Sequence, residues 1–521
     1  MAAVIVGMTK TSACAIEGRD DGRERVPSDD PERGAVSGRQ PHSPARPAAG
    51  RTPAVIWLLV LATFVVVLNE TIMINAIPEL MTALAITEQT AQWLSTAFML
   101  TMAAVIPATG WFLQRVSTRH AYATAMGLFL AGTALAAVAP TFEVLLAARI
   151  VQAAGTAVMM PLLMTTLMRV VPEEDRGRVM GNVSLAMSVA PAMGPAVSGV
   201  ILQLGSWRLL FAVVLPIAAV ITWGGLKRLQ DVGEIEAGSI DWFSVVTAAA
   251  GFGGLVYGLS RFEGGDSVLA AAIVVAGLVT IAVFVVRQLW LQKHGVPLLD
   301  LRTLRRRTYT VALILMSVAF MAMLGSMILL PLYLQSLRGL NALETGLLVM
   351  PGGLAMGLLG PTVGRLFDRF GGRVLVVPGS IGIMLTLAGF TQVSMTMPYW
   401  QILVLHALLM VSLAATFTPV FTLALGAVPP RLYSHGSSIL STLQQVAAAF
   451  GTALVITVMS ARSDALRAAG VTEALADLGG MRLAFVIGAV LSVAVVGTAL
   501  LLPARTEDAE SSEEARAVHA V

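Results

Sequence analysis

The chain has 521 residues, of which 56% are hydrophobic and 12% are charged, and its mean hydropathy is +0.79. Soluble domains carry about 25% charged residues, so this composition excludes a water-soluble protein and indicates a polytopic membrane protein. The formal net charge of +3 does not favour nucleic-acid binding, and the single cysteine, Cys14, excludes an intrachain disulfide and a cysteine-based metal cluster.

Both ends of the chain are polar. Residues 1–51 mix arginine, aspartate, proline, glycine and serine without hydrophobic periodicity, which predicts a disordered cytoplasmic tail. The apolar segment 2–8 is short and has no basic region before it, so we expect the first span to direct insertion. Residues 505–521 are acidic and are expected to form a solvated cytoplasmic tail.

Between the tails, nearly uncharged stretches long enough to cross a membrane fill the chain. The run 374–430 would form a helix of about 85 Å, against a hydrocarbon core of about 30 Å, so we expect it to turn at Pro398. This division predicts fourteen transmembrane helices, which are the two parts of 374–430 and the stretches 52–69 (extending to 78), 89–114, 120–142, 144–168, 179–207, 209–226, 242–260, 267–286, 308–337, 345–364, 432–461 and 483–504.

An even number of spans places both termini on one side of the membrane. If the N-terminus is cytoplasmic, the inner loops hold 17 arginines and lysines and the outer loops hold 6. Cytoplasmic loops collect basic residues, so this bias predicts a multi-pass protein of the cell membrane with both termini in the cytoplasm.

The first span contains a carboxylate, Glu70, in an otherwise apolar helix. A central charge costs about 2.5–3.5 kcal/mol on insertion scales, so such a residue usually faces a cavity or a partner. A carboxyl group that holds either a proton or an organic cation couples the movements of the two. The alternative is that Glu70 reaches the outer surface or ties helices together.

Two loops carry the same pattern. The segment Gly110-Trp-Phe-Leu-Gln-Arg-Val-Ser-Thr-Arg119 has a counterpart, Gly364-Arg-Leu-Phe-Asp-Arg-Phe-Gly-Gly-Arg373, 254 residues later. This duplication predicts two six-helix halves, at 52–228 and 305–504, with two inserted helices at 240–290. Duplicated halves with a site at their interface are typical of transporters.

The repeated loops also predict a cytoplasmic gate. Glycine lets two helix ends approach closely, and arginines can hold acidic groups or helix C-termini. The alternative is that the arginines serve only as topology signals. The candidate gate residues are Gly110, Gln114, Arg115, Arg119, Gly364, Asp368, Arg369 and Arg373.

Further polar residues lie inside the predicted spans. A buried arginine such as Arg149 stays charged, so it can favour the ionised form of nearby carboxyl groups, or it can hold carbonyl groups in a structural role. We expect His406 to be a packed residue rather than a proton carrier. Buried amides often pair between helices, but they can also line a substrate cavity. The candidates for the cavity are Asn69, Asn75, Asn182, Gln444 and Gln445.

The loop motifs resemble those of the major facilitator superfamily, and within it the fourteen-helix drug:proton antiporters of the EmrB/QacA type, especially the lincomycin-resistance-like branch. The resemblance covers about residues 55–503. The family's loop motif, Gly-x-Leu-x-Asp-Arg-x-Gly-Arg-Arg, matches well at 364–373. It matches more loosely at 110–119, where Gln114 replaces the aspartate.

Three further segments carry the resemblance. Residues 68–78 are similar to the first-helix signature Leu-Asp-x-Thr-Ile-Val-Asn-Val-Ala-Leu-Pro, with Asn69 at the aspartate position and Glu70 one residue later. Residues 146–155 are similar to the family's Arg-x-x-Gln-Gly motif, and 190–199 to Gly-Pro-x-x-Gly-Gly, which is associated with antiporters. The antiporter-motif residues are Pro191, Gly194, Pro195 and Gly199.

The resemblance implies an all-α major facilitator fold and proton coupling through Glu70 and Arg149. It implies no cofactor, because the proton gradient drives transport. In the fifth span, proline removes a backbone donor and glycine permits close helix approach, so the antiporter motif predicts a bend that shapes or seals a central cavity. The alternative is that the bend serves only helix packing.

The sequence therefore predicts a proton-coupled multidrug exporter of amphipathic compounds that works by alternating access, as a monomer in the lipid bilayer. The alternatives are a dedicated exporter of one metabolite or antibiotic and, with less support, a solute importer. An enzyme or ATP-driven pump is excluded, because no polar segment after residue 51 can form a catalytic domain and no lysine follows a glycine, as a Walker loop requires.

Overall fold

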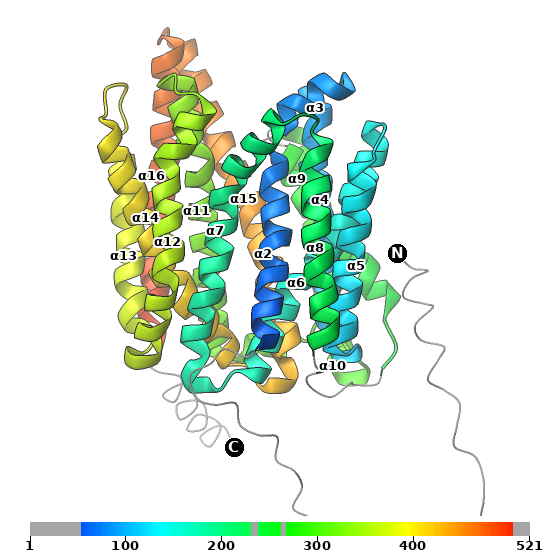
Figure 1. Ribbon diagram of the computed structural model, residues 1–521. Coiled ribbons are helices and arrows are strands. Elements are labelled where there is room, and N and C mark those ends of the chain that lie inside the picture. The colour runs from blue at the N-terminus through cyan, green and yellow to red at the C-terminus, as the bar shows by residue number, and fades with distance from the viewer. Residues whose placement is uncertain (1–53, 75, 230, 232–237, 262–266, 504–521) are drawn as a thin grey trace, which may run out of the picture. The chain divides into compact units, whose positions relative to one another are not determined.

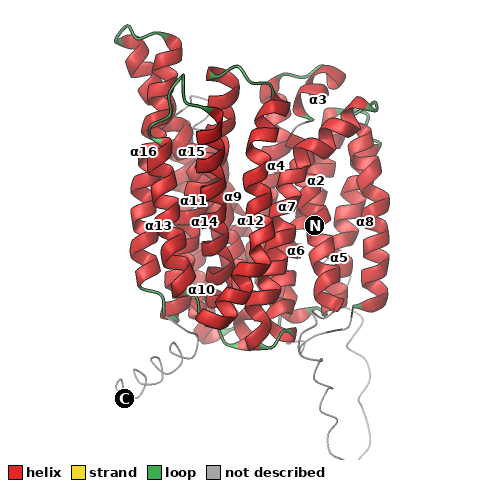
Figure 2. Ribbon diagram, turned by 60° about the vertical axis from the view of Figure 1, so that its left-hand side comes forward, coloured by secondary structure: helices red, strands yellow, loops and turns green. Residues whose placement is uncertain are grey.

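The computed structural model describes residues 54–503, except 75, 230, 232–237 and 262–266. The predictions for the tails at 1–51 and 505–521 therefore concern residues outside the described part of the chain. The described residues belong to one compact unit, and they form helices and loops without a strand (Figures 1 and 2).

The helices follow one another in an up-and-down order. The N-terminal half consists of α2 (Ala54–Ile74), the short α3 (Ile77–Leu84), α4 (Glu88–Arg115), α5 (Thr118–Ala137), α6 (Phe142–Val170), α7 (Arg176–Gln203) and α8 (Arg208–Arg228). The inserted helices are α9 (Trp242–Arg261) and α10 (Ser267–His294). The C-terminal half consists of α11 (Arg307–Leu332), α12 (Ala342–Phe370), α13 (Arg373–Phe390), α14 (Tyr399–Gly426), α15 (Tyr433–Ala468) and α16 (Glu473–Leu500).

Thirteen helices among the described residues are long and apolar enough to cross a membrane. Helix α7 is not one of the thirteen, although it has 28 residues and packs against α2 and α12. The predicted count of fourteen spans therefore depends on α7. The predicted turn at Pro398 is present, because α13 ends at Phe390 and α14 begins at Tyr399.

Helix ends are set by local hydrogen bonding as well as by hydropathy. Helix α12 begins with a capping box in which Asn341 Oδ1 accepts from the Glu344 N–H (2.9 Å) and Glu344 Oε2 accepts from the Asn341 N–H (3.0 Å). It ends at Gly371, whose φ of 81° lies in the region that favours glycine. This sharp stop places the start of α13 two residues later.

Two helices extend beyond their predicted spans. Helix α15 was expected to end at 461 and α16 to begin at 483, but they reach Ala468 and Glu473. In the additional turns Arg467 donates to Asp464 (2.8 Å) and Asp477 (2.5 Å). Ion pairs stabilise helical turns outside the apolar layer, so hydropathy alone misplaces these ends.

The packing of the helices is the same in the two halves. Helix α5 packs against α6 and α8, as α13 packs against α14 and α16, and α4 packs against α6 as α12 packs against α14. The two halves meet where α7 contacts α12 and where α4 contacts α15. Helix α7 has the same place in its half as α15, and α4 has the same place as α12. The two contacts between the halves are therefore equivalent, which agrees with the predicted architecture of two six-helix halves.

The inserted helices lie beside one seam between the halves. Helix α9 packs against both α4 and α15, and α10 packs mainly against α9. Arg287 of α10 donates to Asp241, just before α9, from Nε (3.0 Å) and Nη2 (3.3 Å), and these bonds lower the pKa of the Asp241 carboxyl. In the most apolar part of α10 only 17% of the residues are buried, so this helix presents its surface to lipid.

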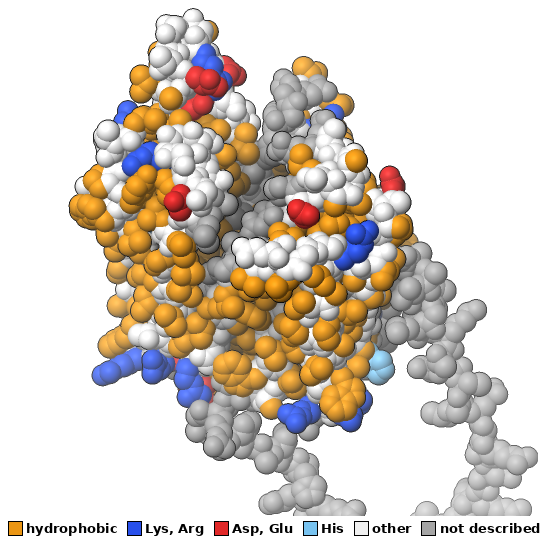
Figure 3. Space-filling model, turned by 45° about the horizontal axis from the view of Figure 1, so that its top comes forward, with side chains coloured by type: hydrophobic (Ala, Val, Ile, Leu, Met, Phe, Trp, Pro, Cys, Tyr) orange, Lys and Arg blue, Asp and Glu red, His pale blue; other side chains and the backbone are white. Residues whose placement is uncertain are grey.

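Side chains divide the surface into zones (Figure 3). Apolar side chains cover the flanks, basic and acidic side chains both lie at the upper end of the bundle, and a row of basic side chains lies along the lower end. We call this the basic end; α4 and α12 end there and α5, α7, α13 and α15 begin there. At the opposite end the surface is hollowed between the two halves.

Candidate functional site

A cavity of about 440 Å³ lies between the two halves, a size typical of small-molecule sites. Its walls come from α2, α6, α7, α11, α12, α14 and α15, so both halves contribute. Nine methionines line it: Met160, Met164, Met180, Met187, Met323, Met327, Met350, Met356 and Met410.

The chemistry of this methionine cavity is almost wholly apolar. Phe320 and Phe417 are stacked in its wall with ring centroids 5.7 Å apart. The polar lining groups are few, and no charged side chain is among the described residues that line it. Because methionine is flexible and polarisable, such a surface can adapt to lipophilic molecules of different shapes.

The predicted cavity residues are only partly in the wall. Gln444 lines the cavity, whereas Asn69, Asn182 and Gln445 are not among its lining residues, and Asn75 lies outside the described residues. Asn69 is buried in α2, and its Nδ2 has no hydrogen-bond partner among the described groups. His406 packs against Gly352, as expected for a packed residue, and also lines the cavity.

Helical phase explains these differences. On α7, the lining residues Met180, Val183, Ser184 and Met187 follow the spacing of one helix face. Asn182 falls off that stripe, and Gln445 is turned by about 100° from Gln444. The spacing of such a face can be read from the sequence, but the direction in which the face turns cannot.

Glu70 and Arg149 interact electrostatically inside the bundle. Glu70 is half-buried near the end of α2, and Arg149 on α6 is 2% exposed. Arg149 Nη1 donates to Gln152 Oε1 (2.6 Å), and Gln152 Nε2 donates to Thr133 Oγ1 (2.8 Å) on α5. The guanidinium carbon lies 4.1 Å from the ring centroid of Phe98 on α4. Arg149 therefore contacts α4 directly and is linked to α5 through Gln152.

The predicted antiporter motif on α7 contacts α2 beside Glu70 and also reaches the cavity. Gly194 packs against Thr71, the neighbour of Glu70, where an added Cβ would lie 2.7 Å from the Thr71 Cβ. Pro191, one turn away, lines the cavity. A Cβ at Gly199 would meet nothing within 4 Å, so no close approach requires that glycine. The side chain of Pro195 is outside the described part of the structure.

At the basic end, α7 and α12 are in backbone contact. A Cβ added to Gly364 would lie 2.7 Å from the Gly177 carbonyl carbon, and one added to Gly360 would lie 2.6 Å from the Gly181 carbonyl oxygen. Asp368 accepts hydrogen bonds from the Gly177 N–H (2.8 Å) and the Arg178 N–H (2.7 Å). Its carboxylate thus caps the positive end of α7 from the other half.

The equivalent contact between α4 and α15 uses neutral groups. Gln114 Nε2 donates to the Arg431 carbonyl (2.8 Å), and His435 Nε2 donates to Gln114 Oε1 (2.9 Å). Thr109 and Ser438 share a hydrogen bond of 2.7 Å. Gln114 therefore occupies the place that Asp368 has in the repeat. We call the two contacts together, α7 with α12 and α4 with α15, the basic-end seal.

Gly110 and the loop arginines surround the seal. A Cβ at Gly110 would lie 2.9 Å from His435 Nδ1, so this glycine permits the α4–α15 contact. The guanidinium of Arg115 donates to the Gly238 and Trp111 carbonyls. The backbone N–H of Arg119 donates to Asp231 (3.0 Å), which lowers the pKa of that carboxyl. The side chains of Arg369 and Arg373 are exposed. His435 was missed in the sequence because its partner is 321 positions away.

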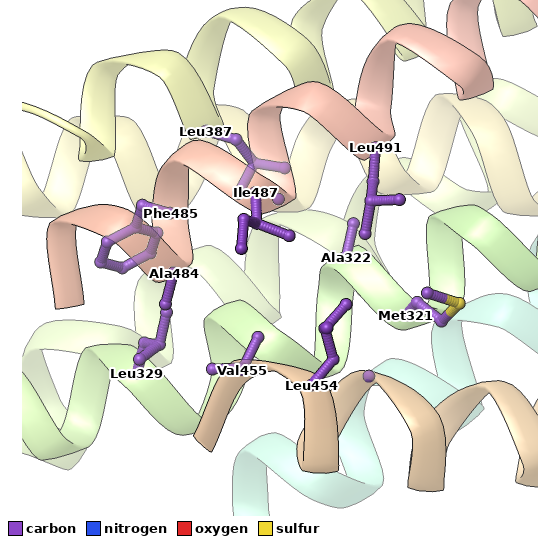
Figure 4. A pocket seen from close by; sticks show the side chains of 12 residues that line it. Met321, Ala322, Leu329, Leu387, Leu454, Val455, Ala484, Phe485, Ile487 and Leu491 are labelled. Carbon is purple, nitrogen blue, oxygen red and sulfur yellow. The ribbon is translucent and has the colours of Figure 1, made fainter. Parts of the chain in front are cut away.

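A smaller apolar crevice in the C-terminal half is a packing space rather than a site (Figure 4). Side chains of α11, α13, α15 and α16 enclose it, including Leu329, Leu387 and Phe485. Its volume of about 20 Å³ is near the minimum that holds one water molecule. The methionine cavity is therefore the candidate substrate site.

Two similar six-helix halves around a central cavity define an integral membrane transporter rather than an enzyme. The model of the Major Facilitator Superfamily matches residues 59–452. The chain belongs to the major facilitator superfamily, which confirms the resemblance inferred from its motifs.

Several relatives match most of the chain. It is 37% identical over 445 residues to lincomycin resistance protein LmrB of Listeria innocua, covering 84% of this chain and 94% of the relative. It is 37% identical over 441 residues to the uncharacterized MFS-type transporter YcnB of Bacillus subtilis, covering 84% and 92%. It is 29% identical over 406 residues to the putative multidrug resistance protein MdtD of Serratia proteamaculans, covering 77% and 83%.

Solved structures share the fold. The human organic anion transporter MFSD10 superposes with a TM-score of 0.59 at 15% identity, covering 85% of this chain and 100% of the other. The proton:xylose symporter XylE superposes with a TM-score of 0.58 at 13% identity, covering 85% and 95%. At these identities the likeness concerns the fold alone.

Proposed function

We propose that this protein exports lipophilic, amphipathic compounds from the cell in exchange for protons. The methionine cavity is the observation that carries the proposal, because it is large, adaptable and shared between the two halves. The relatives named for lincomycin and multidrug resistance support export of drugs as the physiological result.

The conformation supports alternating access. The two halves are in backbone contact at the basic end and the surface is hollowed between them at the opposite end. We assign the basic end to the cytoplasm, because the basic loops predict that orientation, and place the protein in the cell membrane. The described state is then outward-facing, and opening the seal while closing the opposite end makes the cavity accessible from inside.

We assign proton coupling to Glu70 and Arg149. Glu70 is not among the residues that line the methionine cavity, so proton and drug do not compete for one carboxylate. Instead, a proton on Glu70 removes its attraction to Arg149 on α6, and α6 supplies Met160 and Met164 to the cavity wall. The contact of Thr71 with Gly194 provides a second connection between the Glu70 region of α2 and the cavity wall, through α7.

The energetics permit one proton per neutral drug molecule. A hundredfold drug gradient costs about 2.7 kcal/mol, whereas one proton releases about 2.3 kcal/mol per 100 mV and about 1.4 kcal/mol per pH unit. This scheme requires only the substrate and protons as ligands, so we propose that no cofactor takes part. We also propose a monomer, because one chain supplies both halves of the cavity wall.

A drug-susceptibility panel in an efflux-deficient host tests the function. The host expresses the wild type, Glu70→Gln or the matched control Glu79→Gln, whose carboxylate is exposed on α3. We expect resistance to several unrelated lipophilic compounds with the wild type and with Glu79→Gln, and loss of resistance with Glu70→Gln. No protection by the wild type at normal membrane levels would contradict drug export.

A transport assay separates coupling from binding. In sealed vesicles, an imposed pH gradient is expected to drive drug uptake into inverted particles by the wild type and Glu79→Gln, but not by Glu70→Gln. Undiminished pH-driven uptake by Glu70→Gln would refute the role of this carboxylate while leaving export itself intact.

A dedicated exporter of one metabolite or antibiotic is the second candidate, since LmrB is named for resistance to a single antibiotic. It predicts protection against one compound class in the same panel. An importer is not favoured by the relatives named for resistance, and it predicts uptake of solute together with protons.

A further inference from the structure

A second cavity, of about 430 Å³, opens at the basic end away from the methionine cavity. It lies where the short helix η3 (Leu301–Arg305) leads into α11 and where η5 (Pro430–Leu432) leads into α15. We call it the arginine pocket. Five arginines line it: Arg302, Arg305, Arg306, Arg307 and Arg431.

Among the described residues that line the arginine pocket, the charged side chains are all basic. No acidic side chain is among its described lining residues. Asp300, which precedes η3, lies 3.7 Å from Arg302 Nε and offsets the charge of that arginine. Arg305, Arg307 and Arg431 are exposed, so their guanidinium groups are accessible to a ligand. Like charges that converge on one pocket repel each other unless an anion lies between them.

The start of α11 adds to this potential. The N-terminus of a helix carries a partial positive charge and normally attracts acidic residues. Here Arg307 is the first residue of the helix, and the first turn contains no acidic residue. Arginines at the positive end of a helix are unfavourable alone and favourable when an anion binds there.

Membrane topology does not explain the convergence. A basic residue acts as a topology signal wherever it lies in a cytoplasmic loop. The arginine pocket brings Arg431, from the loop after α14, against the arginines before α11. The carbonyl of Arg431 also accepts the bond from Gln114 in the basic-end seal, so the pocket adjoins a contact between the halves.

We propose that the arginine pocket binds a ligand with clustered phosphate groups, either the headgroup of an anionic phospholipid or a soluble polyphosphate. Guanidinium groups form paired hydrogen bonds with phosphate oxygens, and basic pockets at membrane surfaces bind such headgroups. Bound phosphate bridges η3, the start of α11 and η5, and thereby stabilises the α15 side of the basic-end seal. This inference does not rest on the proposed function, because binding is measured without transport.

The test uses the full chain, purified and delipidated in detergent. Binding is measured by native mass spectrometry and by the shift in melting temperature, first with cardiolipin against phosphatidylcholine, then with tripolyphosphate against chloride at equal ionic strength. The variant Arg305→Gln/Arg307→Gln is compared with Lys227→Gln/Arg228→Gln, which removes the same charge at the end of α8. Arg431→Gln, on the other wall, is an independent second variant.

We expect cardiolipin or tripolyphosphate to bind the wild type and the α8 control equally, and the Arg305/Arg307 variant about 30-fold more weakly. Stabilisation by cardiolipin alone identifies a lipid site, and stabilisation by tripolyphosphate identifies a soluble ligand. Absence of binding by both probes, or an equal loss in the α8 control, would overturn the proposal. Retained binding in both Arg305→Gln/Arg307→Gln and Arg431→Gln would also overturn it.

Discussion

Replacing Gly364 with alanine perturbs the closest contact of the basic-end seal. The new Cβ would lie 2.7 Å from the Gly177 carbonyl carbon and 3.1 Å from the Arg178 Cα. Carbon atoms pack at about 3.5–4.0 Å, so α7 and α12 must separate locally by about 0.8 Å or more. Overpacking of this kind costs about 1–3 kcal/mol.

This cost applies to the sealed state, in which the two backbones touch. Alanine also has a higher helix propensity than glycine, by about 1 kcal/mol, but this gain is present whether the seal is closed or open. We therefore expect the ratio of sealed to unsealed molecules to fall by about 5- to 150-fold.

Spin-label distances across the seal measure this ratio. Labels at Glu174→Cys and Phe370→Cys, both exposed at the basic end, are introduced in a Cys14→Ser background. Gly364→Ala is expected to shift the distance distribution to longer values. The matched control is Gly224→Ala on α8, where an added Cβ meets nothing within 4 Å. An unchanged distribution in folded Gly364→Ala protein would refute the assignment of this contact as the seal.

Three further changes test other contacts. Asp368→Asn removes the charge that caps α7 at the Gly177 N–H, and should reduce the sealed population about fivefold in the same distance measurement; no shift would contradict this. Asp241→Asn should lower the free energy of unfolding at pH 7 by about 1 kcal/mol, since it breaks the paired bonds to Arg287, and the loss is measured as a lower melting temperature. Because the folded-state pKa of Asp241 is lowered, this difference should be present above about pH 4 and vanish as the pH falls through the lowered value; a pH-independent difference would argue against the ion pair. Met356→Trp fills part of the methionine cavity and should reduce resistance to the bulkiest substrates about tenfold without changing the melting temperature; equal loss for all substrates would indicate misfolding instead.

The sequence alone was sufficient to predict the class of protein and its duplicated helical architecture. Apolar runs of membrane length, the bias of basic loops and the repeat of 110–119 at 364–373 predicted a duplicated helical transporter, because the bilayer imposes length and polarity on each span separately. These signals are local in the chain, so they can be read without knowing which helices touch. The antiporter motif on α7 was also visible as a short segment, but its contact with Thr71 on α2 could not be predicted from that segment.

Only the tertiary structure decided which residues face one another. A helix pattern gives the spacing of a stripe but not the partner toward which it turns. Gln444 therefore lines the cavity while Gln445 does not, and Glu70 is not among the residues of the cavity wall. The partnership of Gln114 with His435 and the convergence of Arg431 on the arginines before α11 depend on helices that are distant in sequence and adjacent in space. Such contacts follow from how the two halves dock, which no short segment of the chain encodes.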